Sequence, residues 1–334
     1  TEDQEYILQH FLKAMEEIKP DVIIVAGDLY DRAIPPKEAV ELLNRIFTSI
    51  VYGLNIPILS ITGNHDSAER MSFGTQLLKK NNLFIQTKIT KDLEPIILED
   101  EHGPVYFHLI PYMEPAEVKD ILGNDKISTH QEAMEEITSR IMNQYDVLNE
   151  RHIVVGHAFL AGGMESESEE RLTMIGGTPY VDAELFKPFT YTALGHLHQA
   201  QKVKYDHIRY SGSIFKYSFS EVNHKKTFTI VEIDEKGVQS IEQQPYELRR
   251  DLIKLEGYLE ELTASSSDDY VHITLLDDGE IMDPVGKLRK KYPNLLGLKR
   301  NTKGAQHLAD LQKAKEKQQM SNLELFESLY ENRK

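Results

Sequence analysis

The chain has no cysteine among its 334 residues, which excludes disulfide bonds and any zinc site built on thiolates. A chain without cysteine suits a reducing compartment, so we expect the protein to act in the cytoplasm. Its apolar runs are short, and none approaches the roughly 20 residues that a membrane-spanning helix needs. We therefore expect no membrane partner.

Positive charge is also scarce, with 38 lysines and arginines against 54 acidic residues and a net charge of −16. The deficit lies in residues 1–245, which contain 23 basic and 38 acidic residues, whereas residues 246–305 contain 10 and 11. The bulk charge therefore gives no indication of a nucleic-acid partner. A partner of that kind would have to meet local basic patches or metal ions bound to the protein.

Four glycine-led motifs are present, and each follows a short apolar run. They are G-D-L-Y-D at 27–31, G-N-H-D at 63–66, G-H at 156–157 and G-H-L-H at 195–198. Short runs rich in β-branched residues and ended by glycine indicate buried strands. Such strands deliver polar side chains at their carboxyl ends, where open α/β sheets bind ligands.

The polar residues of these motifs are ligands for divalent metals, with no thiolate among them. A pair of divalent ions about 3.5–4 Å apart suits phosphoester hydrolysis, because it activates water and neutralises phosphate oxygens. Asp28 is the candidate for a carboxylate that bridges two ions. Oxygen and nitrogen ligands are offered by Asn64, His157, His196 and His198. His196 and His198 are two residues apart, and a break at Gly195 would let both rings face one cleft.

The remaining periodicity predicts a mixed α/β chain. Helices are expected over 2–18, 36–50 and 130–149, and strands over 83–86, 95–98, 105–110, 208–211, 227–233 and 238–243. The last three strands are expected to complete a second sheet. The acidic, glycine-rich segment 161–171 is interpreted as a solvated loop. The helix at 36–50 is expected to pack on a sheet, with a dimer contact through it or through 70–80 as the alternative.

The pattern changes near residue 245. Residues 246–305 read as strand, helix, strand, helix and strand, which predicts a small α/β domain. The segment 306–334 is helical in composition. Its apolar stripe is expected either to pack on its own protein or to bind a partner, and it consists of Leu323, Leu325, Phe326, Leu329 and Tyr330.

Longer strings around the motifs carry a family resemblance. G-D-L-Y-D-R-A-I-P-P, T-G-N-H-D-S, G-H-L-H-Q and Y-S-G-S-I-F-K-Y-S-F-S-E resemble those of calcineurin-like metallophosphoesterases, and among them the SbcD-type nuclease subunits of bacterial SbcC–SbcD complexes. The resemblance covers nearly the whole chain. It implies an α/β two-sheet sandwich flanked by helices in 1–245, a capping domain in 246–305, and the start of a partner-binding region in 306–334.

The resemblance also implies an activity. Members of this family are Mn²⁺-dependent DNA nucleases that act as exonucleases on duplex ends and as endonucleases on hairpins and single strands. They work in DNA repair and recombination with an SbcC-type ATPase that controls access to duplex DNA. The resemblance implies a homodimer within a heterotetramer. It also implies two divalent metal ions in each nuclease subunit, with Mn²⁺ as the expected ion.

The family's site residues map onto the motifs of this sequence. Asp28 would bridge the two metals, and His198 would bind one of them. Asn64, His157 and His196 would complete the other metal site. His65 would be catalytic, placed over the phosphate to stabilise charge or protonate the leaving oxygen. Asp31 would either orient an imidazole or form a turn, and Asp66 is expected to be a local turn or capping residue rather than a ligand. No role is assigned to His10, His102, His108, His152, His207 or His307.

One family feature is absent from this sequence. The family opens with a strand that ends in D-x-H, whose Asp and His bind the same metal as His198. The chain starts at Thr1 with the helix that normally follows this strand. We expect that the strand is truncated rather than lost. We also expect that the polypeptide as written holds one metal well and the other poorly, through Asp28 and His198 alone.

Two basic clusters in 246–305 are candidates for DNA contacts, with a solvated helix face as the alternative. They consist of Lys287, Arg289, Lys290, Lys291, Lys299 and Arg300. Two other functions fit the motifs less fully. One is another metallophosphoesterase, acting on cyclic nucleotides or phosphoproteins, and the other is a catalytically impaired scaffold of a DNA complex.

Overall fold

The computed structural model describes residues 2–169 and 179–300, and it separates the chain into one compact unit up to Arg249 and another from Arg250 onward. The elements of the first unit, in chain order, are α1 (Glu2–Ile18), β1 (Ile23–Ala26), α2 (Lys37–Thr48), a π-helical turn (Ser49–Gly53), β2 (Ile58–Ile61), α3 (Ala68–Met71), α4 (Thr75–Lys79), β3 (Leu83–Gln86), β4 (Ile96–Asp100), β5 (Gly103–Ile110), α5 (Pro115–Leu122), α6 (His130–Gln144), β6 (Arg151–His157), β7 (Phe159–Leu160), β8 (Tyr180–Val181), a 3₁₀ turn (Ala183–Phe186), β9 (Tyr191–Gly195), β10 (Gln201–Val203), β11 (Tyr205–Tyr210), a second 3₁₀ turn (Phe219–Glu221), β12 (Thr227–Asp234) and β13 (Gly237–Pro245).

Two sheets contain the motif strands. A three-stranded parallel sheet has the order β1-β2-β3, and a six-stranded sheet has the order β10-β11-β9-β6-β5-β4. In the larger sheet β11, β9, β6 and β5 are parallel, whereas β10 and β4 pair antiparallel at its two edges. Parallel strands are buried on both faces, which explains why each motif follows a predominantly apolar run.

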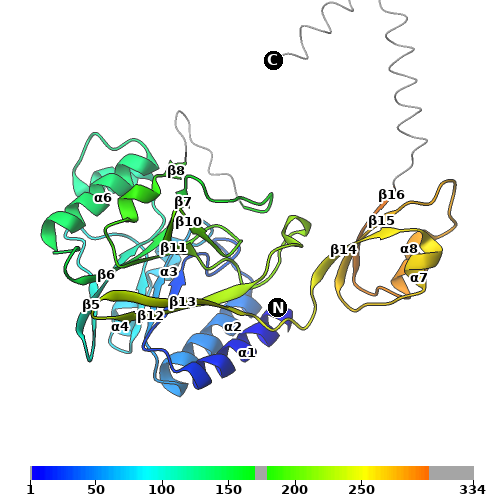
Figure 1. Cartoon of the computed structure of the whole chain (residues 1–334), viewed down its shortest axis with the longest axis horizontal. Helices are drawn as coiled ribbons and strands as arrows, with labels where there is room; N and C mark the ends of the chain where they lie inside the picture. The colour runs from blue at the N-terminus through cyan, green and yellow to red at the C-terminus, as the bar shows by residue number, and fades with distance from the viewer. Residues whose placement is uncertain (1, 170–178, 301–334) are drawn as a thin grey trace, which may run out of the picture. The chain divides into compact units, whose positions relative to one another are not determined.

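The two sheets face each other across a shared apolar core. Leu59 of β2 packs with Phe107 of β5, Ile153 of β6 and Tyr191 of β9. Helices α1 and α2 cover the outer face of the small sheet, and α5 and α6 cover the outer face of the large one. Figure 1 shows α1 and α2 on one side of the strands and α6 on the other. The predicted two-sheet sandwich flanked by helices is thus confirmed.

Helix α6 shows how local sequence sets an element and how packing ends it. Thr129 accepts a hydrogen bond from the backbone N–H of Glu132, whose side chain in turn accepts one from the backbone of Thr129. The helix ends at Gln144, before the predicted end at 149. Tyr145 leaves the helical conformation and packs its ring 5.5 Å from that of His108. Tertiary packing of this ring therefore overrides the helical pattern.

The strands predicted over 208–211, 227–233 and 238–243 exist, but they do not complete one sheet. β11 joins the large sheet, whereas β12 and β13 pair only with each other in a two-stranded hairpin. This hairpin packs on α1, where the rings of Phe228 and Phe11 meet edge to face at 5.2 Å. The expectation was wrong on this point because β12 buries its apolar side chains against a helix and the sandwich rather than extending a sheet.

The second unit has the predicted strand–helix–strand–helix–strand order. It contains β14 (Leu252–Gly257), α7 (Leu259–Thr263), β15 (Tyr270–Leu275), α8 (Pro284–Arg289) and β16 (Leu295–Arg300). The strands form a parallel sheet in the order β14-β15-β16, with Val271, Ile273 and Leu288 fully buried between sheet and helices. The segment 306–334 lies outside the described residues. None of the helices that the structure describes combines the length and apolar character needed to cross a bilayer.

Candidate metal centre

The carboxyl ends of the motif strands meet at one edge of the sandwich. β1 and β2 run side by side and end together, with Ala26 paired to Ile61. β6 and β9 do the same in the larger sheet, with His157 paired to Gly195. The residues that follow each strand are the polar residues of the motifs. The fold therefore gathers side chains that lie up to 168 positions apart in the chain, from Asp28 to His196.

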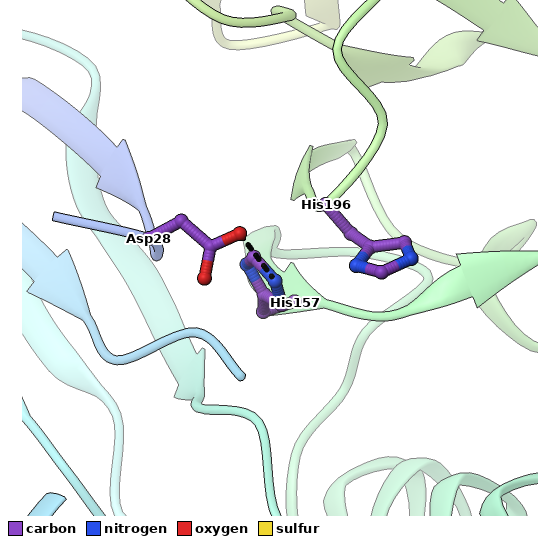
Figure 2. Close-up of side chains that lie close together, drawn as sticks. All are labelled: Asp28, His157 and His196. Atoms are coloured by element: carbon purple, nitrogen blue, oxygen red, sulfur yellow. Dashed lines mark ion pairs between the residues drawn. The ribbon is translucent and has the colours of Figure 1, made fainter. Parts of the chain in front are cut away.

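Asp28, His157 and His196 form a cluster in which one ligand atom from each lies within 4.8 Å of the others. Figure 2 shows the Asp28 carboxylate facing the His157 ring, with His196 beside them. Asp28 Oδ2 is 3.3 Å from His157 Nε2. Asn64 joins the same cluster, because its Oδ1 lies 2.9 Å from His157 Nε2 and 3.1 Å from His196 Nδ1.

The chemistry of this donor set fits a divalent cation. His157 Nδ1 donates to the carbonyl of Ala26 at 2.8 Å, so the neutral ring presents the lone pair of Nε2 to Asp28 and Asn64. A nitrogen lone pair, a carboxylate oxygen and an amide oxygen then face one another, and all three are electron-rich. A proton or a cation among them is needed to offset their repulsion. Nitrogen and oxygen ligands of this kind suit Mn²⁺ and similar ions.

The pKa values at the cluster reflect this arrangement. Burial alone would raise the pKa of Asp28, but His157 and the backbone N–H of His65 outweigh it and lower the pKa to about 2. Burial lowers the pKa of His157, but Asp28 outweighs that effect and raises it. Burial, followed by the charge of His157, lowers the pKa of His196 to about 3. Asp28 is thus ionised and His196 neutral near pH 7, which are the ligand forms that bind metals.

Two of the clustered residues have backbone conformations that L-residues rarely adopt. The φ angle is 51° at Asp28 and 105° at His196, and such conformations cost roughly 1–3 kcal/mol each. The expected break in the strand at Gly195 is therefore made by His196 itself. Gly195 serves close packing instead, because a Cβ atom there would lie 1.8 Å from the carbonyl oxygen of Ala26.

His65 lies next to the cluster without belonging to it. Its backbone N–H donates to Asp28 Oδ1 at 3.1 Å, and its Nδ1 donates to the backbone carbonyl of Asp31 at 3.1 Å. The neutral ring therefore presents the lone pair of Nε2 on its other side. The Asp31 carboxylate is 84% exposed and pairs with Arg32 at 3.2 Å, so the contact of Asp31 with an imidazole is made by its carbonyl.

Asp66 connects two motif loops. Its carboxylate accepts hydrogen bonds from the backbone N–H groups of Leu29 at 3.1 Å, Tyr30 at 3.0 Å and Gly63 at 2.9 Å. It therefore does more than form its own turn, because it fixes the loop after β1 against the loop after β2. Burial raises the pKa of this carboxyl despite the three backbone donors.

His198 lies outside the cluster of three found among the described residues. Its Nδ1 is 3.0 Å from Glu221 Oε1 and 3.2 Å from Ser168 Oγ, and its backbone N–H donates to Glu169 at 2.9 Å. Sequence reasoning missed both Glu221 and the loop residues. Glu221 is the last residue of the string Y-S-G-S-I-F-K-Y-S-F-S-E, so the signal was present without a role attached to it.

The interpretation of 161–171 as a solvated loop holds only in part for residues 161–169, which form an irregular and partly exposed loop with several contacts to the protein. Ser168 donates to Glu221 at 2.7 Å, and Gln201 Oε1 accepts a hydrogen bond from the backbone of Met164 at 2.8 Å. The loop is acidic and glycine-rich, but its polar side chains hold the residues around His198. Composition alone does not distinguish such contacts from solvation.

The basic candidates lie in the second unit. Lys287 and Arg289 are on α8, Lys290 and Lys291 follow it directly, and Lys299 and Arg300 end β16. The side chains of Lys287, Arg289 and the two lysines after α8 are exposed, and so is that of Lys299, whereas Arg300 is half-buried.

Comparison with known proteins identifies the family. Residues 1–200 match the calcineurin-like phosphoesterase family, and residues 248–334 match the family described as the type 5 capsule protein repressor C-terminal domain. A solved structure of the calcineurin-like phosphoesterase YfkN from Bacillus subtilis has a TM-score of 0.36 and 13% identity, and it covers 72% of this chain and 81% of that chain. So distant a similarity says nothing about function.

Two curated relatives are much closer in sequence. The D subunit of nuclease SbcCD from Staphylococcus epidermidis is 37% identical over 89% of this chain and 79% of the relative. The D subunit of nuclease SbcCD from Staphylococcus saprophyticus is 36% identical over 90% of this chain and 80% of the relative. The chain therefore belongs to the calcineurin-like phosphoesterases and, within them, to the family of SbcCD nuclease D subunits.

Proposed function

We propose that the protein is a metal-dependent DNA nuclease that hydrolyses phosphodiester bonds with two divalent ions. Mn²⁺ is the proposed ion. The observation that carries this proposal is the set of mutually facing acceptors, Asp28, Asn64, His157 and His196, at one edge of a phosphoesterase sandwich. It occurs in a chain whose relatives are named as nuclease subunits.

Each metal has named ligands in this proposal. Asn64, His157 and His196 would hold one ion and His198 the other, and the Asp28 carboxylate would be shared between them. Two bound divalent ions would neutralise phosphate oxygens and lower the pKa of a water molecule that attacks phosphorus. Ionised Asp28 and neutral His196 are in the forms that bind metals.

His65 is the catalytic side chain in this proposal. Its Nδ1 is held by the carbonyl of Asp31, so the ring has a fixed orientation beside Asp28. In this proposal Nε2 is the ring atom that would face the phosphate. An imidazole there can donate a hydrogen bond to a phosphate oxygen or give a proton to the leaving oxygen.

The proposed substrates, partner and assembly are based on the relatives, and the proposed DNA contacts are based on the charge distribution. We infer exonuclease action on duplex ends, endonuclease action on hairpins and single strands, and a role in DNA repair and recombination in the cytoplasm. The partner is an SbcC-type ATPase, bound by a nuclease homodimer within a heterotetramer. Residues 246–305 act as a capping domain whose basic side chains contact phosphates, and 306–334 begin the partner-binding region.

The test is a nuclease assay on the full-length protein with end-labelled duplex, hairpin and single-stranded DNA. Mn²⁺, Mg²⁺ and a chelator are compared, with and without the ATPase subunit. A small phosphodiester is tested in parallel. We expect DNA cleavage with Mn²⁺ and none with the chelator. Hydrolysis of the small ester alone would instead support another phosphoesterase, and DNA binding without cleavage would support a scaffold.

A further inference from the structure

A buried polar network surrounds His198, and Glu221, Lys226 and Ser168, which form it, are not among the proposed metal ligands. Glu221 is fully buried and accepts from His198 Nδ1 at 3.0 Å with its Oε1 atom. Ser168 donates to the same oxygen at 2.7 Å. The second oxygen, Oε2, accepts from Lys226 Nζ at 2.6 Å. Both oxygens of this carboxylate are therefore committed.

Lys226 holds this carboxylate in place. Its ammonium group donates to Glu221 Oε2, to Ser213 Oγ at 2.7 Å and to the backbone carbonyl of His198 at 2.9 Å. Three donors meet three acceptors, so neither buried charge is left without compensation. Because Lys226 contacts both Glu221 and the main chain of His198, it fixes the carboxylate relative to the imidazole that it contacts.

The ionisation of Glu221 decides the direction of the hydrogen bond. Glu221 Oε2 lies 2.6 Å from Lys226 Nζ and both groups are buried, which is the geometry of an ammonium–carboxylate ion pair. An ionised carboxylate can only accept, so His198 Nδ1 must be the donor. In a neutral ring the lone pair is then on Nε2, on the side away from Glu221.

We propose that Glu221 is a positioning residue that, anchored by Lys226, holds His198 in the Nδ1–H tautomer and so makes Nε2 its metal ligand. This inference rests on the proposed function, in which His198 binds one of the two ions. Partners of this kind fix the tautomer and orientation of metal-binding histidines in other proteins. Ser168 and Glu169 of the preceding loop support the same ring and its backbone.

The experiment compares two double variants in which the buried ion pair is removed as a whole. Glu221→Gln with Lys226→Met keeps an acceptor oxygen beside His198. Glu221→Leu with Lys226→Met removes the acceptor and leaves an apolar pair. Replacing both charges avoids an unpaired buried ion, and such replacements are often neutral or stabilising. Thermal unfolding establishes that each variant folds as the wild type does.

The first readout needs neither metal nor substrate. NMR of the metal-free full-length protein with ¹⁵N-labelled histidine reports the tautomer of His198 under conditions in which its ring is neutral. The His198 signals are assigned by their loss in His198→Ala. We expect the Nδ1–H tautomer in the wild type and in the Gln–Met variant, and a shift to Nε2–H in the Leu–Met variant. An Nε2–H tautomer in the wild type would overturn the inference, even where a variant fails to fold.

The second readout is Mn²⁺ binding by calorimetry to the site whose signal His198→Ala removes. We expect the Leu–Met variant to bind Mn²⁺ there about 10–100-fold more weakly than the wild type. The Gln–Met variant should retain most of the affinity. Wild-type affinity in the Leu–Met variant would mean that the network merely supports the fold. DNA cleavage is assayed separately, so a wild type with the expected tautomer and affinity but no nuclease activity would refute the proposed function alone.

Discussion

At the scale of single residues, three motif histidines are each oriented by a hydrogen bond at Nδ1, and each bond is made to a different acceptor. Nδ1 contacts the carbonyl of Ala26 in His157, the carbonyl of Asp31 in His65 and the carboxylate of Glu221 in His198. In each neutral ring the lone pair is therefore on Nε2. The motifs indicate which side chains are candidate ligands. They contain no information on tautomers, because two of the three acceptors are backbone carbonyls from other segments.

His65→Ala tests the catalytic role of this residue. The ring contacts Asp31 rather than Asp28 and lies outside the cluster of candidate metal ligands, so its loss should leave Mn²⁺ affinity unchanged. Removal of a general acid should lower kcat on DNA by about 10²–10⁴-fold. Calorimetry and a nuclease assay measure the two effects, with His102→Ala as a control distant in sequence from every motif. Full activity in His65→Ala would remove this role.

Gly63→Ala tests how closely backbone and ligand approach at the cluster. A Cβ atom at Gly63 would lie 2.1 Å from Asp28 Oδ1 and 2.7 Å from a ring carbon of His157, so both side chains must move. We expect Mn²⁺ binding to weaken and kcat/KM to fall about 100-fold, as for ångström-scale misplacement of reacting groups. Gly53→Ala is the matched control, because a Cβ atom there meets no atom within 4 Å. Comparable losses in both variants would contradict this explanation.

At the scale of elements, the strands before the motifs could be predicted from the sequence. The hairpin and loop contacts that surround these strands could not. The apolar runs before Gly27 and Gly63 are long enough only for buried strands, and the structure has β1 and β2 there. The packing of the β12–β13 hairpin on α1, by contrast, joins residues more than 200 positions apart, and no local pattern specifies it. The same holds for the loop residue Ser168, whose partner Glu221 lies 53 positions away.

The adjacent strands β5 and β6 contain a buried histidine pair that should make stability depend on pH. His108 Nε2 lies 2.9 Å from His152 Nδ1, and His108 Nδ1 is buried without a hydrogen-bond partner among the described residues. Burial, and then the charge of His152, lowers the pKa of His108 from 6.5 to about 3, and burial also lowers the pKa of His152. The rings of Tyr106 and Tyr145 pack around the pair, with Glu150 as the nearest carboxylate.

The folded state therefore binds fewer protons than the unfolded chain once the pH drops below 6.5. Stability rises with pH through this window and is lost as the pH falls toward about 3. His108 alone should cost about 1 kcal/mol of unfolding free energy at about pH 5.5 relative to about pH 7.5. Urea unfolding at both pH values measures this, and His108→Gln should reduce the difference. A difference that is the same in His108→Gln would assign the pH dependence to other groups.

At the scale of the whole molecule, the acidic excess of the first 245 residues would repel the phosphates of DNA. The first 245 residues have 15 more acidic than basic residues, whereas residues 246–305 are nearly neutral. Bound divalent ions would offset part of the repulsion at the metal centre. Exposed lysines that follow one another on and after α8 offer a local positive surface in a domain with little opposing net charge.

Reversal of this surface charge tests whether it binds phosphates. The triple variant Lys287→Glu, Lys290→Glu and Lys291→Glu should weaken binding to all DNA sequences alike and reduce the salt dependence of log K by roughly one for each lysine that binds a phosphate. Fluorescence anisotropy over a range of salt concentrations measures both effects. The matched control reverses three exposed lysines of the first unit, Lys13, Lys19 and Lys236, so that net charge changes equally. If the α8 lysines bind phosphates, the salt dependence of log K should become flatter in the Lys287, Lys290 and Lys291 variant only. Equal effects in this variant and in the control would mean that net charge, and not α8, governs DNA binding.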